Sequence, residues 1–151
     1  MSSKEAAVTI IEFDNNQYLK GIKHLRRLHN AIFYKKVLEI GYQPYENETP
    51  YSLIIHPYFL KQYNNRWFLF GYNPEKEKYN RNMAIDRIVN IKEIKEKYHK
   101  NTQINWQEYF DDIIGVTKLD NTNTEATILH FLGKTGGYME SKPLHGSQKS
   151  K

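Results

Sequence analysis

Three arginines in the middle of the sequence, Arg66, Arg81 and Arg87, have the chemistry to hold an anion. A guanidinium group presents a planar fork of N–H donors that matches the oxygens of a phosphate. Arg81 and Arg87 are six positions apart, so one unbroken strand would place them on one face, roughly 20 Å apart. That spacing suits an oligonucleotide better than one phosphate, and a bend near Asp86 would change it. Arg81 has the stronger functional case, since Arg87 has an equally simple interpretation as a salt bridge that fixes a turn.

Polar and aromatic side chains precede these arginines with the spacing of a strand. Ser52, His56 and Tyr58 have the same strand parity, so they are expected on one face. His56 stands before Pro57, which favours an extended backbone. A hydroxyl, an imidazole and a phenol on one face could surround a phosphate, although a lone histidine is more often structural.

Composition narrows the class of protein. The 151 residues include 22 Lys and Arg against 17 Asp and Glu, and residues 51–100 hold ten of the former and five of the latter. The positive excess therefore lies in the most β-like part of the chain, where aromatic residues are also frequent, and this favours an anionic partner that carries a base.

The chain has no Cys, no metal-ligand spacing among its histidines, and no nucleophile motif, so we expect neither a metal or cofactor nor an enzyme. No segment has the length of a membrane span or a secretory signal, which predicts a cytoplasmic protein without membrane contact.

Periodicity predicts one helix followed by several antiparallel strands. The helix begins near Gln17 after an asparagine cap, because apolar residues then recur at steps of three and four. Short runs bounded by polar turns predict the strands, and the Asn64-Asn65 pair suits a hairpin turn. The expected strands cover residues 36–42, 51–60, 66–72, 78–86 and 88–94, with further elements at 8–13 (strand), 105–115 (helix) and 124–132 (strand). This order predicts an α+β, mainly β fold in which the helix packs on a small antiparallel barrel.

The stretch from Arg66 to Tyr72 resembles the WYL domain, which is named for a Trp-Tyr-Leu triplet, here Trp67-Phe68-Leu69. His56-Pro57-Tyr58 is similar to the strand that leads into the triplet in that family. Arg81 followed by Asp86-Arg87-Ile88 is similar to its "R…DRI" signature. The resemblance is strong over about residues 17–94 and weaker from there towards the C-terminus, where the sequence is similar to the start of the family's C-terminal extension.

The resemblance implies an Sm-like, SH3-type barrel that senses a nucleotide or a single-stranded nucleic acid in a bacterial transcriptional regulator. DNA contact in such regulators comes from a winged helix-turn-helix, which the sequence before residue 17 does not contain. Phe68 replaces the family's Tyr, and a Phe can stack on a base but cannot donate a hydrogen bond. The ligand-binding residues expected from the arginines, the parity and the resemblance together are Ser52, His56, Tyr58, Arg66, Phe68, Arg81 and Arg87.

The expected organisation has three parts. Residues 1–16 form an N-terminal arm, residues 17–97 the WYL barrel, and residues 98–151 a linker with the beginning of a C-terminal α/β extension. The alternative function is a structural oligomerisation module, in which exposed strand edges pair with another copy to form a homodimer and no small ligand is bound.

Overall fold

The structure, a computed structural model, describes residues 21–119 and 122–150. The five predicted strands after the first helix are confirmed, with their ends moved by three residues at most. The predicted arm, its strand at residues 8–13 and the asparagine cap near Gln17 lie outside the described residues. The elements are η1 (Ile22–His24), α1 (Leu25–Phe33), β1 (Val37–Tyr42), β2 (Tyr51–Tyr63), β3 (Arg66–Asn73), η2 (Pro74–Lys76), β4 (Lys78–Ala84), η3 (Ile85–Arg87), β5 (Ile88–Ile94) and α2 (Thr135–Ser141).

The strands form one sheet in the order β4-β3-β2-β1-β5, and all four neighbouring pairs are antiparallel. The hairpin between β2 and β3 turns at Asn64 and Asn65, whose φ angles are 48° and 58°. Two consecutive residues with positive φ are what a tight type I′ hairpin turn needs, and Asn tolerates that backbone better than most residues. The predicted role of this Asn pair is confirmed.

The sheet is curled, although its edges do not pair. β4 and β5 lie at opposite edges, yet only the three residues of η3 connect them. Four peptide steps, from Ala84 to Ile88, span at most about 14 Å, so the two edges must approach each other at this end. The Tyr42 hydroxyl bridges the gap by accepting a hydrogen bond from the Ala84 N–H at 3.2 Å. Within the described residues no ladder joins β4 to β5, so the expected closed barrel is corrected to an open, curled sheet.

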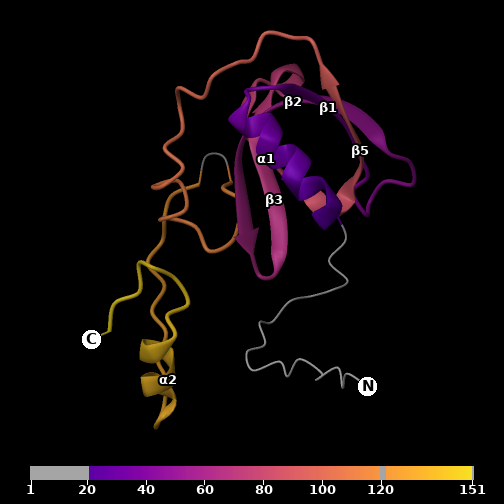
Figure 1. Cartoon of the computed structure of the whole chain (residues 1–151). Coiled ribbons are helices and arrows are strands. Elements are labelled where there is room, and N and C mark those ends of the chain that lie inside the picture. Colours follow the sequence, from indigo (N-terminus) through magenta and orange to yellow (C-terminus); the bar gives the residue numbers. More distant parts are fainter. Residues whose placement is uncertain (1–20, 120–121, 151) are drawn as a thin grey trace, which may run out of the picture.

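The core lies on the concave face of this sheet and is covered by α1 (Figure 1). Leu28 and Ala31 of α1 are buried there because they lie three positions apart on one helix face. The helix ends where Lys35 adopts a φ of 53° and the Lys36 N–H returns to the Ala31 carbonyl at 2.8 Å. Leu69 is fully buried in this core and Trp67 packs against it, as the sequence predicted for both.

The convex face of β2, β3 and β4 is covered by the chain that follows β5, which passes over the sheet and descends on the side of β3 (Figure 1). Phe70 is fully buried under Trp106 and Phe110, with ring centroids 5.3 and 5.4 Å away. Asn82 anchors the same segment by donating to the Val116 carbonyl at 3.0 Å. Residues 98–117 are therefore packed against the sheet.

Two predicted elements after β5 are wrong. The stretch expected to be a helix at 105–115 forms a series of turns that begins at Asn105, whose side chain caps the Gln107 N–H. The packing of its rings on the sheet overrides the local helical preference. Residues 124–132 form no strand, because no other strand lies beside them to take their backbone hydrogen bonds, and Ile128 is 85% exposed. The C-terminal part of the chain contains the short helix α2, away from the sheet (Figure 1), and the α/β extension expected there stays a prediction. Within the described residues, no helix combines the length and the hydropathy that crossing a bilayer requires.

Candidate anion-binding site

Arg81 and Arg87 meet at one end of the sheet, beside three tyrosines. Arg81 extends from β4 and donates to the Tyr51 hydroxyl at 3.0 Å. Arg87 lies in η3 with its guanidinium carbon 4.7 Å from the ring centre of Tyr45. η3 follows β4 after Ala84, so Arg81 and Arg87 do not lie on the one unbroken strand that the predicted separation assumed.

Tyr42 joins the two arginines. Its ring lies edge-on to that of Tyr51, with centroids 6.0 Å apart, and its phenol is near enough to Arg87 for the two to interact electrostatically. Burial raises the pKa of Tyr42, while the Ala84 N–H and the charges of Arg87 and Arg81 oppose that rise. A buried phenol that responds to both guanidinium groups shows that the two charges act on one small region.

Arg66 reaches the same region but is paired. Its Nη2 lies 2.5 Å from Oδ2 of Asp86, and the Asp86 side chain is only 15% exposed. The hydrogen bond that Arg66 donates to Asp86 raises the pKa of Arg66, burial opposes that rise, and the charges of Asp86, Tyr45 and Tyr42 add to it. Part of the Arg66 charge is therefore already compensated within the protein.

The charges of this region do not balance. Neither Arg81 nor Arg87 forms an ion pair within residues 21–119 and 122–150. Three guanidinium groups against the Asp86 carboxylate leave two positive charges in excess. Nε of Arg87 is also buried without a hydrogen-bond partner in the described part of the chain. Leaving such a donor unsatisfied costs about 1–3 kcal/mol. The excess of positive charge in this region favours a negatively charged partner.

His56 and Tyr58 lie elsewhere, on the convex face under the chain that follows β5. His56 is 5% exposed, and its Nδ1 accepts the His99 N–H at 3.0 Å. Tyr58 donates to the His99 carbonyl at 2.8 Å. Burial, and then the charge of His99, lowers the pKa of His56, against the opposing effect of Glu96. Burial raises the pKa of Tyr58, and it raises that of neighbouring Tyr98 to about 12.

Within the described residues, Ser52 and Phe68 form no hydrogen bond or ring stacking with the three arginines. Ser52 donates to the Glu39 carboxylate at 2.9 Å across β1 and β2. Phe68 is half-buried and pairs in register with Lys61 of β2. The structure thus places Arg66, Arg81 and Arg87 near Tyr42 and its neighbouring tyrosines, whereas Ser52, His56 and Tyr58 are engaged in other contacts.

Sequence reasoning missed the three tyrosines. Tyr42 and Tyr51 are register partners across β1 and β2, and Tyr45 lies in the turn between those strands. The sequence could have predicted the pairing of Tyr42 with Tyr51. In an antiparallel hairpin, the residue that ends one strand lies opposite the residue that begins the next. We call Tyr42, Tyr45, Tyr51, Arg81 and Arg87 the Arg–Tyr cluster. Among the described residues, no group of three or more His, Asp or Glu side chains is placed to hold a metal ion.

Residues 23–93 match the family model of the WYL domain. The chain contains a WYL domain. The whole Arg–Tyr cluster and Arg66 lie within the matched residues. No curated protein matches the chain.

The fold of this WYL domain is similar to part of the solved structure of proteasome accessory factor B/C (PafBC) of Arthrobacter aurescens, with a TM-score of 0.50 and 15% identity. The similarity covers 56% of this chain and 13% of the PafBC chain, so it spans only a small part of that protein. At this identity the likeness concerns the fold alone.

Proposed function

We propose that this WYL domain is the ligand-sensing part of a bacterial transcriptional regulator and binds a nucleotide or a single-stranded nucleic acid at the Arg–Tyr cluster. The observation that supports the proposal is the pair of guanidinium groups of Arg81 and Arg87, which have no acidic partner among the described residues and lie beside three tyrosine rings. Guanidinium forks bind phosphate oxygens, and phenol rings stack on bases.

The proposal extends to the type of fold, the cellular compartment and the source of DNA contact. The curled sheet is of the Sm-like, SH3-type kind that the family resemblance implies, and the domain acts in the cytoplasm without catalysing a reaction. DNA contact in the regulator would come from a winged-helix segment outside this chain. The ligand roles of Ser52, His56, Tyr58 and Phe68 stay predictions.

The decisive experiment is a fluorescence-anisotropy titration with a short fluorescein-labelled oligothymidylate, repeated with labelled ATP and over a range of salt concentrations. Binding that weakens as salt rises, and that weakens in Arg81→Gln and Arg87→Gln, supports the proposal. Binding that is insensitive to salt and to both substitutions contradicts it. Alanine variants of Ser52, His56, Tyr58 and Phe68 in the same titration test their predicted roles.

A second candidate function is oligomerisation through the strand edges. Within the described residues β4 and β5 each have an unpaired edge, and Val89 of β5 is 49% exposed. Unpaired edges are templates for pairing with another chain. Light scattering with and without the nucleotide separates the two functions, because an oligomerisation module forms dimers whether or not ligand is present.

A further inference from the structure

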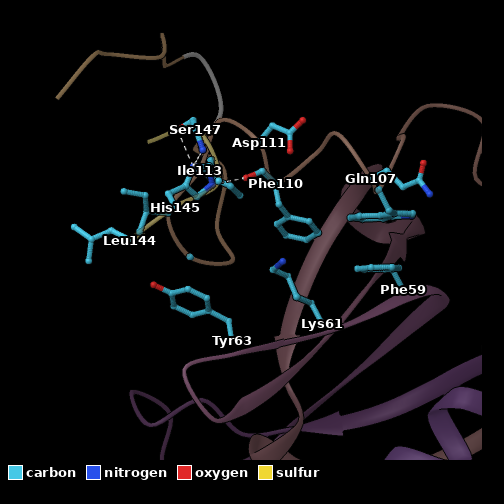
Figure 2. Close-up of a pocket in the computed structure, with 14 residues that line it drawn as sticks. Phe59, Lys61, Tyr63, Gln107, Phe110, Asp111, Ile113, Leu144, His145 and Ser147 are labelled. Carbon is cyan, nitrogen blue, oxygen red and sulfur yellow. Dashed lines mark hydrogen bonds between the residues drawn. The ribbon is translucent and has the colours of Figure 1, made fainter. Parts of the chain in front are cut away.

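A pocket lies on the convex side of the sheet, where the end of β2 meets the turns that follow Asn105 and the segment at 144–147 (Figure 2). Its volume is about 620 Å³, which is within the usual range for sites that hold small molecules. The Arg–Tyr cluster does not contribute to it, since none of that cluster's residues lines the pocket. Its lining includes Phe59, Lys61 and Tyr63 of β2, Trp106 and Phe110 of the turns, and His145.

One wall of the pocket is built of stacked rings. The planes of Phe59 and Trp106 are 2° from parallel, with centroids 5.3 Å apart, and Figure 2 shows the Phe59 ring beneath Gln107. Phe110 continues this wall, 6.0 Å from Phe59. Tyr63, 40% exposed, lies on the other side of the hollow. Flat, rigid walls of this kind favour a flat aromatic ligand, because rings stack offset or edge-on at such distances.

Lys61 supplies one positive charge at this wall. Its Nζ lies 3.9 Å from the ring centre of Phe110. Lys61 forms no ion pair within the described residues. Asp111 is the only acidic residue that lines the pocket, and Figure 2 shows its carboxylate on the far side of the Phe110 ring from Lys61. The ammonium group is therefore available to a ligand that carries a negative charge.

His145 fixes the third side of the pocket. Its Nε2 lies 3.0 Å from the Phe110 carbonyl, which can only accept, so Nε2 carries the proton. Its Nδ1 accepts the Ser147 N–H at 3.2 Å. The imidazole thereby ties the segment at 144–147 to the turn at Phe110, and Lys61 is the basic side chain that selects the sign of the ligand.

From these contacts we propose that the pocket binds a flat aromatic carboxylic acid, with its rings beside Tyr63 and the ring wall and its carboxylate at Lys61 Nζ, which lies over the Phe110 ring. The inference does not depend on the proposed function, because it uses a different face of the sheet and a different basic residue. A charge-assisted hydrogen bond contributes enough to make an acid bind about tenfold more tightly than its neutral amide.

The test uses the whole chain and two probes of one shape, 2-naphthoate and 2-naphthamide, measured by isothermal titration calorimetry. We expect 2-naphthoate to bind about tenfold more tightly than the amide. Lys61→Met, which keeps the length of the side chain and removes its charge, should abolish the difference, while Phe110→Ala should weaken both probes. Lys97→Met removes an exposed charge elsewhere and should change neither affinity.

Three results would overturn the inference: no binding of 2-naphthoate at millimolar concentration, equal affinity of acid and amide, or an unchanged preference in Lys61→Met. Loss of 2-naphthoate binding in Arg81→Gln would also overturn it, because the ligand would then occupy the Arg–Tyr cluster. Retained binding in Arg81→Gln, with oligothymidylate binding lost, would support both sites as separate. Near-UV circular dichroism of each variant shows that the packing of the rings is kept.

Discussion

The backbone of His99 is bound at both ends to side chains of β2. Its N–H donates to Nδ1 of His56 at 3.0 Å, and its carbonyl accepts from the Tyr58 hydroxyl at 2.8 Å. Both partners are buried, so these bonds attach the first residues after β5 to the convex face of the sheet. Nδ1 can accept the N–H only while it carries no proton, and the attachment therefore depends on a neutral imidazole.

The stability of the domain should fall as the pH falls below about 6.5. Burial lowers the pKa of His56 in the folded protein, so the unfolded chain takes up the proton first. The contribution of His56 is complete above the unfolded pKa, decreases as the pH falls towards the folded pKa, and is constant below it. Its slope is at most about 1.4 kcal/mol of unfolding free energy per pH unit. Urea denaturation between pH 5 and pH 8 measures it.

The matched variant for this prediction is His56→Asn. The Asn Oδ1 can take the place of Nδ1 as acceptor of the His99 N–H and does not titrate, so the slope should become smaller. It should not vanish, because burial also lowers the pKa of His24. His130→Gln removes an exposed histidine and should leave the slope as it is. An equal slope in the wild type and His56→Asn would show that the imidazole is not what ties His99 to the sheet.

Removing the charge of Arg81 should change how oligonucleotide binding depends on salt. If Arg81 contacts one phosphate, Arg81→Gln lowers the slope of log affinity against log salt by about 0.7, the value for one contact to a single strand. The same anisotropy titration at four or more salt concentrations gives the slope. Lys97→Gln removes the same charge from an exposed site beyond β5, so it should leave the slope unchanged. Equal changes in both variants would indicate a general effect of net charge.

The strands and the core could be predicted from the sequence because they rest on local patterns. The alternation of residues along β3 predicted which side chains lie on each face of that strand. The Asn64-Asn65 pair predicted the turn before it. Trp67 and Leu69 point into the core for the same reason. Period-two alternation needs no knowledge of the rest of the fold, so these predictions hold.

The candidate site was less predictable because it depends on long-range placement. The three residues of η3 bring Arg87 to Tyr45 and Tyr42, and no local pattern marks where a curled sheet brings its edges together. His56 and Tyr58 have the expected parity. Their polar atoms are nevertheless hydrogen-bonded to the backbone of His99, in the chain after β5. Residues 124–132 show the opposite error, a strand-like pattern without a neighbouring strand to pair with.

Gly71 is required by the close approach of β2 and β3. A Cβ at this position would lie 2.4 Å from the His56 carbonyl oxygen and 2.8 Å from a side-chain carbon of Ile55. Since one of these atoms is backbone in the middle of the sheet, Gly71→Ala should destabilise the domain by about 1–3 kcal/mol, measured by urea denaturation. Gly136→Ala is the control, because its Cβ meets nothing within 4 Å. A Gly71→Ala variant as stable as the wild type would mean that the strands can move apart here at no cost.

Asp86 should limit the affinity of the Arg–Tyr cluster for anions, because it holds Arg66 and places a negative charge beside the other two arginines. Asp86→Asn removes that charge and frees the Arg66 guanidinium, so we expect oligothymidylate to bind several-fold more tightly, together with a loss of about 1 kcal/mol of stability. Glu93→Gln on β5 raises the net charge by the same amount but breaks only the exposed pair with Lys36, whose Nζ lies 2.9 Å from Glu93. The gain should therefore appear in Asp86→Asn and not in Glu93→Gln, and combining Asp86→Asn with Arg66→Gln should cancel it. If the affinity falls in Asp86→Asn while the domain stays folded, the carboxylate instead holds Arg66 in the position that binding requires.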